Sequence, residues 1–187
     1  MSNDLFLLQL GHPKISSIDV IRYGRVCDVF NDIFFKIEES IYLYIKNVPV
    51  RIRYFEDLYH NFDEILAMTW MIQKHEEGET KISLRNQIVV MEWEISWKDE
   101  EVSISIDCLA KESLYEKYAV VLNAKNKLIM SSKAFLSEWK TLLHQVLLAF
   151  EAANVEIEDG TERRKLELLQ RVEAGIDGYG KLYTRPI

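Results

Sequence analysis

The sequence has few of the residues that mark specialised chemistry or a multidomain chain. Only two cysteines occur in 187 residues, Cys27 and Cys108, too few for the disulfide framework of a small secreted domain. They have no C-x-x-C spacing for zinc or redox chemistry, so both are predicted to be buried free thiols. With three prolines and seven glycines the chain has no Pro- or Gly-rich linker, and we expect residues 1–187 to form a single globular domain.

Long apolar runs are also missing. No stretch approaches the roughly 20 apolar residues that a membrane-spanning helix requires. The short apolar stretch at 5–8 has no lysine or arginine before it and no small-residue cleavage site close behind it, which disfavours a signal peptide. The sequence therefore predicts a cytoplasmic protein that does not bind a membrane.

Positive charge is in the minority. The chain has 23 lysines and arginines against 30 aspartates and glutamates, a formal net charge of −7. Both halves carry an acidic excess, and no basic tail or stripe gathers the positive charge. This balance disfavours a nucleic-acid partner, whose phosphates would be repelled, but it permits a basic protein surface as a partner.

No catalytic, metal-binding or nucleotide-binding motif occurs. No serine lies in G-x-S-x-G, and the histidines lack the spacing of a metal box. We therefore predict no catalytic residue, no metal ligand and no cofactor. One enzymatic alternative stays open, a small metal-dependent hydrolase in which Glu56, His60 and Glu64, each one helical turn apart, share a metal ion. The same spacing is also ordinary decoration of a solvated helix.

Apolar periodicity predicts an α+β protein, because steps of three and four residues indicate amphipathic helices and alternation indicates half-buried strands. The expected helices cover 25–39, 55–72, 132–154 and 161–175. The expected strands cover 4–10, 41–46, 48–54, the two arms of a hairpin over 87–109, and a further pair over 115–124 and 127–130. Since the strands come in adjacent pairs, we expect an antiparallel sheet built from β-hairpins, with helices packed on one face.

Local signals refine these boundaries. Pro49 cannot donate to a ladder, so its strand begins beside it or lies at a sheet edge. Gly78 is expected near the stop of the second helix. Ser131 and Ser132 are good cap residues for the third helix, and Thr161 is expected at the start of the last one.

The outward face of the hairpin differs from an ordinary polar surface. With a two-residue tip at 99–100, Trp97 pairs with Val102, and this register sets Glu92 directly opposite Asp107. Like charges opposed in this way cost from a few tenths to about 1 kcal/mol. Such a cost is sometimes kept for function.

Two explanations of this charge pair stay open. Lys117, Lys125 or Lys127 could neutralise it within the monomer. Alternatively, the hairpin face is an acidic docking surface for a basic partner. The predicted partner-binding residues of such a surface are Glu92, Glu94, Asp99, Glu100, Glu101 and Asp107.

A second candidate surface is aromatic. Four tyrosines lie near two arginines in the sequence, a mixture that is enriched at protein interfaces and would suit an oligomer-forming or structural protein. Half-buried tyrosines that cover a sheet would produce the same pattern. The residues concerned are Tyr42, Tyr44, Tyr54, Tyr59, Arg51 and Arg53.

The tryptophan-rich strand 91–97, its acidic tip 98–101 and the helix 132–150 resemble, in general character, the immunity proteins of bacterial polymorphic-toxin and contact-dependent growth inhibition systems. The resemblance implies a cytoplasmic, non-enzymatic protein that binds one cognate toxin domain tightly and blocks its active site. Such toxins are often basic nucleases, towards which an acidic inhibitor gains association rate by electrostatic steering. A protein-binding inhibitor is therefore the leading hypothesis, ahead of a small enzyme and an oligomer-forming protein.

Overall fold

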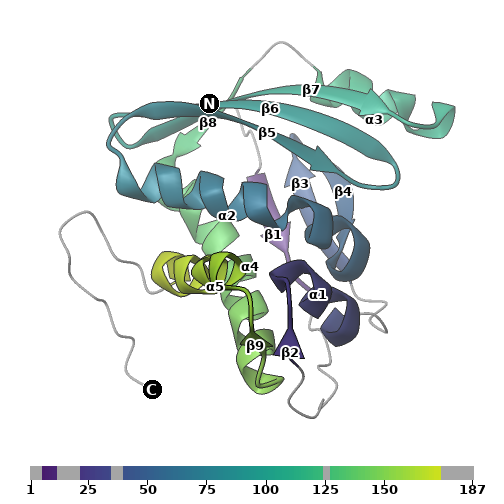
Figure 1. Ribbon diagram of the computed structural model, residues 1–187. Helices are drawn as coiled ribbons and strands as arrows, with labels where there is room; N and C mark the ends of the chain where they lie inside the picture. The colour runs from purple at the N-terminus through teal and green to yellow at the C-terminus, as the bar shows by residue number, and fades with distance from the viewer. Residues whose placement is uncertain (1–5, 12–21, 35–39, 124–126, 174–187) are drawn as a thin grey trace.

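A computed structural model gives the fold of the chain. It describes residues 6–11, 22–34, 40–123 and 127–173. The predicted α+β class is confirmed, with antiparallel sheets and helices packed against them (Figure 1). None of the helices within these ranges combines the length and the apolar character that crossing a membrane requires.

A three-stranded sheet contains β1 (Phe6–Gln9), β3 (Ser40–Ile45) and β4 (Val48–Arg53) in the order β1-β3-β4, and both pairings are antiparallel. β1 and β4 fall within the ranges predicted from alternation, and β3 begins one residue before its predicted range of 41–46. β4 lies at an edge of this sheet, as Pro49 requires. The predicted segments 4–5 and 35–39 lie outside the described residues.

A four-stranded sheet contains β5 (Gly78–Arg85), β6 (Val89–Lys98), β7 (Glu101–Ala110) and β8 (Leu128–Ser131) in that order. The predicted hairpin is formed by β6 and β7, with Trp97 opposite Val102. Asp99 and Glu100 form its tip with φ values of 51° and 64°. Two positive φ values are those of a type I′ turn, whose twist matches that of the strands it joins.

Two expectations about the second half of the chain are wrong. Residues 115–122 do not form a strand, because a 3-10 turn (η2, Ser113–Tyr115) leads into the helix α3 (Glu116–Leu122). Ala119 and Leu122, three residues apart, are the buried positions of α3, which is a helical step rather than an alternation. The strand predicted at 127–130 exists as β8, but it pairs with β7.

Gly78 does not stop a helix. The preceding helix, α2 (Tyr59–Lys74), ends at Lys74, and Gly78 opens β5, a strand that was not predicted. Glycine is required here because a Cβ atom would overlap the indole ring of Trp97. The indole N–H of Trp97 donates to the carbonyl of His75 at 2.9 Å, which holds the ring against the glycine.

The remaining helices confirm the prediction, with small shifts at the ends that lie within the described residues; predicted residues 174–175 lie outside them. They are α1 (Val26–Phe34), α4 (Ser132–Ala152) and α5 (Gly160–Glu173). Ser131 caps α4 as predicted, and its hydroxyl accepts from the Ala134 amide at 3.2 Å. The cap of α5 is Asp159 rather than Thr161, since the Asp159 carboxylate accepts from the amides of Thr161 and Glu162 at 2.8 and 2.9 Å. A short parallel pair, β2 (Arg22–Tyr23) with β9 (Glu156–Ile157), was not predicted.

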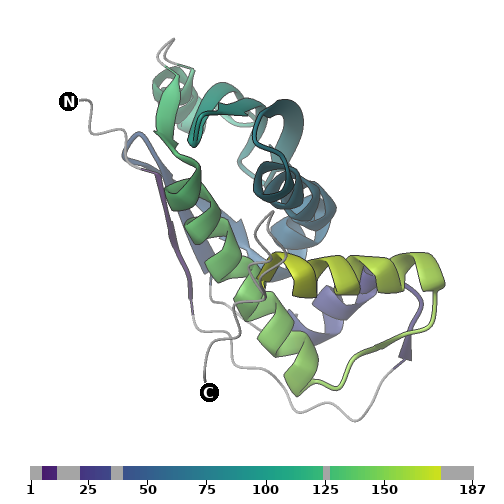
Figure 2. The same ribbon diagram turned by 90° about the vertical axis from the view of Figure 1, so that its left-hand side faces the viewer.

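Helix α4 joins the two larger sheets through a shared aromatic core. Trp139 on α4 has its ring centroid 6.2 Å from that of Trp93 on β6 and 6.2 Å from that of Phe6 on β1. Trp93 and Trp139 are fully buried. Figure 2 shows α4 as the long diagonal helix, with β1 along one side and α2 and α5 on the other. Burial of such large rings supplies much of the stabilisation of this junction.

Side-chain amides satisfy backbone groups at the strand edges. On β5, the amide nitrogen of Asn61 donates to the Arg85 carbonyl at 2.8 Å, and the Asn61 oxygen accepts from the Arg85 amide at 2.9 Å. On β7, Asn123 makes the equivalent pair of bonds to Cys108, beyond the residues that β8 covers. Cys108 is a buried free thiol, as predicted, and its burial raises its pKa to about 11, with a further contribution from Asp107. The side chain of Cys27 lies outside the described part.

Candidate functional site

The four-stranded sheet has one face packed on the core and one face, here called the outer face, turned to solvent. In Figure 1 the helices α1, α2, α4 and α5 lie on the core side of the sheet, and α3 lies beside its end. Alternate residues of every strand therefore point outward. The outer face carries Glu79, Lys81, Ser83 and Arg85 from β5, Val90, Glu92, Glu94, Ser96 and Lys98 from β6, Glu101, Ser103, Ser105, Asp107 and Leu109 from β7, and Ile129 and Ser131 from β8.

The register predicted for the hairpin is confirmed pair by pair. Glu92 lies opposite Asp107, and Glu94 lies opposite Ser105. The three acidic side chains are exposed. Two carboxylates of like charge therefore face each other across β6 and β7, with opposed Cβ atoms about 5 Å apart.

A lysine on β5 compensates the negative charge of Glu94. Lys81 lies opposite Glu94 in the ladder, and its ammonium group is 2.5 Å from a Glu94 carboxylate oxygen. Hydrogen bonding and charge attraction to Lys81 lower the pKa of Glu94, and the same contact raises the pKa of Lys81. Lys127 adds a smaller attraction to Glu94. Both members of the Lys81–Glu94 pair are more than half exposed, so the pair adds little to stability.

Neither Glu92 nor Asp107 forms an ion pair with a lysine or arginine of the described chain. Glu92 accepts a hydrogen bond from the Ser83 hydroxyl at 2.6 Å, and Ser83 in turn accepts from the Arg85 guanidinium at 3.0 Å. Within the described residues, the Asp107 carboxylate makes no hydrogen bond or ion pair. No lysine or arginine of the described chain bridges the two carboxylates.

The lysines that were expected to neutralise Glu92 and Asp107 have other partners or lie outside the described residues. The Lys117 ammonium group sits 5.1 Å from the centre of the Tyr118 ring. Lys127 acts on Glu94, and Lys125 lies outside the described residues. Lysines of the same chain therefore compensate the charge of Glu94, which lies two residues along β6 from Glu92, and not the charges of Glu92 and Asp107.

The acidic tip of the hairpin is attached to the start of α4. The Glu100 carbonyl accepts from the Ser132 amide at 2.7 Å, and Glu101 lies opposite Ser131, the cap residue of α4. The backbone of the tip therefore lies at the end of α4 where the helix dipole is positive. The tip therefore has a structural partner that Glu92 and Asp107 lack.

Two shallow hollows of about 590 and 530 Å³ open onto the outer face. Gly78, Ser96 and Glu101 are among the residues that line the first, and Glu94 and Lys127 are among those that line the second. Small-molecule sites usually enclose most of their ligand. Broad, open hollows on a sheet face suit the side chains of a protein partner better.

The aromatic candidate surface is divided by the fold. Tyr54 is buried, stacks on Phe34 at 5.1 Å, and donates from its hydroxyl to Gln145 at 2.8 Å. Tyr42 and Tyr44 lie on the solvent side of the three-stranded sheet, where Tyr42 is opposite Arg51. The predicted set of four tyrosines and two arginines therefore does not form one surface.

The residues of the enzymatic alternative also have structural partners. The Glu64 carboxylate accepts from the Ser83 amide at 2.5 Å, and the exposed ring of His60 packs edge-on against Tyr59 with centroids 4.6 Å apart. The side chain of Glu56 lies outside the described part. Among the described residues, no group of three or more histidine, cysteine, aspartate or glutamate side chains is arranged to hold a metal ion.

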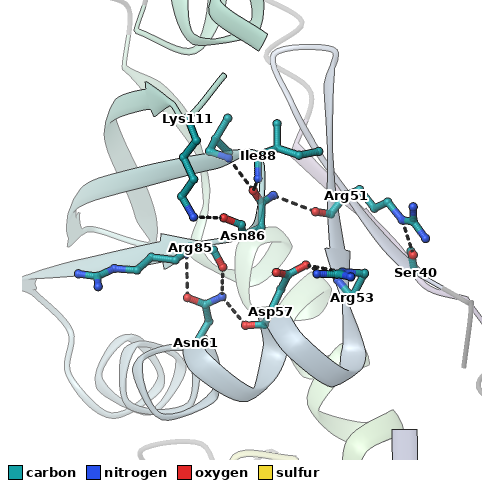
Figure 3. A network of polar contacts seen from close by, with 10 residues as sticks. Ser40, Arg51, Arg53, Asp57, Asn61, Arg85, Asn86, Ile88 and Lys111 are labelled. Atoms are coloured by element: carbon teal, nitrogen blue, oxygen red, sulfur yellow. Dashed lines mark hydrogen bonds and ion pairs between the residues drawn. The ribbon is translucent and has the colours of Figure 1, made fainter. Parts of the chain in front are cut away.

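A buried polar network was missed in the sequence (Figure 3). Asp57 is 5% exposed and lies in a five-residue π-helix, η1 (Tyr54–Leu58). Burial raises the pKa of Asp57, against the opposing effects of Arg53 and, more weakly, Lys111. Its carboxylate accepts from the Arg53 amide at 2.8 Å and lies 3.6 Å from the Arg53 guanidinium.

The network connects the two larger sheets. Asn61 bonds to the carbonyl of Asp57 as well as to β5. Asn86, at the turn between β5 and β6, donates to the Arg51 carbonyl on β4 at 2.9 Å, and the Lys111 ammonium group donates to the Asn86 carbonyl. π-Helical turns often mark functional sites, but neither hollow is lined by these residues. The bonds they make to one another favour a structural role.

The predicted partner-binding residues thus fall into two groups. One group lies in the middle of the outer face, and the other lies at the hairpin tip beside α4. The first contains Glu92, Glu94 and Asp107, and the second contains Asp99, Glu100 and Glu101. No protein-family model, no curated protein and no solved structure matches this chain.

Proposed function

We propose that this protein is a non-enzymatic inhibitor that binds a basic protein on its outer face. One observation carries the proposal: Glu92 and Asp107 face each other on an uncovered sheet, and no cation of the described chain bridges them. The resemblance to immunity proteins adds the expectation that the partner is a cognate toxin domain in the cytoplasm.

The energetics favour a partner over a purely structural explanation. A like-charge pair on an exposed sheet lowers the stability of the monomer, and its replacement by a neutral pair would leave the apolar inner face unchanged. A basic side chain of a partner converts this repulsion into two attractions. The two carboxylates then lower the stability of the free protein but stabilise its complex with the partner.

The arrangement also explains how an acidic sheet can inhibit a basic active site. β-Strands hold carboxylates in fixed rows, and the surrounding acidic excess attracts a positively charged surface before contact. A toxin that acts on nucleic acid presents such a surface. A rigid row of carboxylates occupies the place of the phosphates and blocks access to the substrate.

The test is isothermal titration calorimetry with the product of the reading frame beside this gene. The variant Glu92→Lys/Glu94→Lys/Asp107→Lys should bind at least about 100-fold more weakly than the wild type, because charged groups at the centre of an interface dominate such binding.

The matched control is Glu151→Lys/Glu158→Lys/Glu167→Lys, which changes net charge equally at exposed positions of α4, the β9–α5 connection and α5. The elements that carry these positions lie on the core side of the four-stranded sheet, away from its outer face (Figure 1). An equal loss in both variants would show that only net charge matters. Unchanged binding of the first variant, or no binding by the wild type, would refute the proposal.

A further inference from the structure

We infer that this protein self-associates through the open edge of β5, which pairs antiparallel with β5 of a second copy. The pairing joins two four-stranded sheets into one continuous sheet. It uses the edge of the sheet and leaves the outer face uncovered, so the inference goes beyond the proposed function and does not depend on it.

The C-terminal half of β5 has its edge closed by side chains of α2, which runs along this strand (Figure 1). The Ser83 amide donates to the Glu64 carboxylate at 2.5 Å. The Arg85 amide donates to the Asn61 oxygen at 2.9 Å, and the Arg85 carbonyl accepts from the Asn61 nitrogen at 2.8 Å. Backbone groups that are bonded in this way are not available to another strand.

The N-terminal half of β5 has an open edge. Backbone groups point alternately to the two sides of a strand, so the amides and carbonyls of Glu79 and Lys81 point away from β6, as the Ser83 amide does. Within the described ranges of the chain, no residue hydrogen-bonds to these groups. Ala67 and Met71 follow on the same face of α2 as the capping glutamate, and neither side chain carries a strong acceptor. This part of the edge is therefore a template for a further strand.

The charges beside the open edge complement themselves. Glu79 and Lys81 both point to the outer face and are exposed. When two copies pair antiparallel about an axis at Thr80, Glu79 of each copy lies opposite Lys81 of the other. Each of these two opposed pairs exchanges two main-chain hydrogen bonds, and each brings opposite charges together across the junction.

The same charges select the register. A shift of the pairing by two residues sets either the two copies of Glu79 or the two copies of Lys81 opposite each other, and directly opposed like charges are destabilising. In the complementary register Lys81 lies between Glu94 of its own chain, at 2.5 Å, and Glu79 of the second copy. Charges of one sign would block pairing at this edge, whereas the alternating charges permit it with a second copy in one register.

The test is a charge-swap cycle measured by analytical ultracentrifugation between about 10 μM and about 1 mM, the range in which weak association becomes visible. The wild type should shift from monomer to dimer over this range. Lys81→Glu opposes like charges at both positions of the junction and should weaken dimerisation at least about tenfold. Glu79→Lys/Lys81→Glu exchanges the two charges within each copy and should restore most of the lost affinity.

A control variant and a positional readout locate the contact. Lys133→Glu makes the same change of net charge at an exposed position in the first turn of α4, next to the opposite edge strand β8, and should leave dimerisation unchanged. In hydrogen exchange of the wild type, the Glu79 and Lys81 amides should become protected as the protein concentration rises. The Ser83 amide, which is already bonded to Glu64, should not change.

The inference is overturned if the wild type stays monomeric over the whole range, or if the Glu79 and Lys81 amides exchange at a rate independent of concentration. It is also overturned if Lys133→Glu weakens dimerisation as much as Lys81→Glu, or if the swapped variant dimerises no better than Lys81→Glu. The exchange measurement needs the wild type alone, so it decides the inference whatever the stability of the variants. Binding of the neighbouring gene product to the outer face decides the proposed function separately.

Discussion

Removing the negative charge of Asp107 should stabilise the folded protein. Asp107 and Glu92 are opposed and exposed, and no described cation bridges them. Two unit charges about 6 Å apart in water repel each other by roughly 0.7 kcal/mol. Salt at about 0.1 M, with a screening length of about 10 Å, reduces this repulsion to roughly half.

Asp107→Asn should therefore raise the free energy of unfolding by about 0.4 kcal/mol in 0.1 M salt and by more at low salt. Asp107→Lys, which replaces repulsion by attraction, should raise it by up to about 1 kcal/mol. Urea denaturation is the suitable assay, because urea is uncharged and leaves the ionic strength under control.

A double-mutant cycle isolates the pair. Asp107→Asn in a Glu92→Gln background should give no gain, because the opposing charge has already been removed. The reasoning is refuted if Asp107→Asn destabilises the protein, if its gain persists in the Glu92→Gln background, or if the gain does not shrink with salt.

Three further predictions concern the scaffold. Asn123→Ala removes both side-chain bonds to the Cys108 backbone and should cost about 1–3 kcal/mol of stability, with faster hydrogen exchange at the Cys108 amide. Gly78→Ala should cost about 1–3 kcal/mol in urea denaturation, because its Cβ would overlap the Trp97 ring. Burial raises the pKa of Asp57, so the folded state holds this proton to higher pH than the unfolded chain. The stability that this proton supplies is lost as pH rises from the usual pKa of an aspartate through the raised pKa of Asp57, so the stability of Asp57→Asn relative to wild type should increase over that rise in pH.

Each of these predictions has a clear counter-result. Gly24→Ala, at a position where a Cβ meets no atom within 4 Å, is the control for Gly78→Ala, and an equal cost would contradict the packing argument. Asn123→Ala is contradicted if stability and exchange at Cys108 are unchanged. A stability difference between wild type and Asp57→Asn that stays flat with pH would show that burial does not disfavour the Asp57 charge.

The hairpin could be predicted in detail because its pattern is long. Val89, Met91, Trp93, Ile95 and Trp97 alternate with polar residues over nearly the whole of β6, and one register buries the apolar side chains of both strands. The opposition of Glu92 and Asp107 follows from that register. The helix α4 could be predicted equally well, because its helical pattern of apolar residues continues over many turns and its cap is a serine.

β5 could not be identified in the same way. Only Ile82 and Leu84 are buried in it, a pattern too short to separate from a loop, and Gly78 resembled a helix stop. Because β5 was not predicted, the ion pair between Glu94 and Lys81, a residue of β5, could not be predicted either. The residues 115–122 contain an apolar run that fits a strand or a helix, and periodicity alone does not decide between them.

The buried polar residues depend on tertiary structure. Asp57 and Asn61 lie on helical segments whose other buried positions, apart from Thr69, are apolar. Their partners are backbone groups at the edges of β4 and β5. A polar residue at a core position was the available signal, but the sequence does not show which strand edge it satisfies.

The most direct measurement of the central claim is the association rate with the neighbouring gene product as a function of ionic strength. Stopped-flow mixing of the wild type should give a rate constant that falls steeply with salt, and Glu92→Gln/Glu94→Gln/Asp107→Asn should associate more slowly with a shallower dependence. A rate constant that is insensitive to salt, or identical in the two proteins, would contradict an acidic outer face that steers and holds a basic partner.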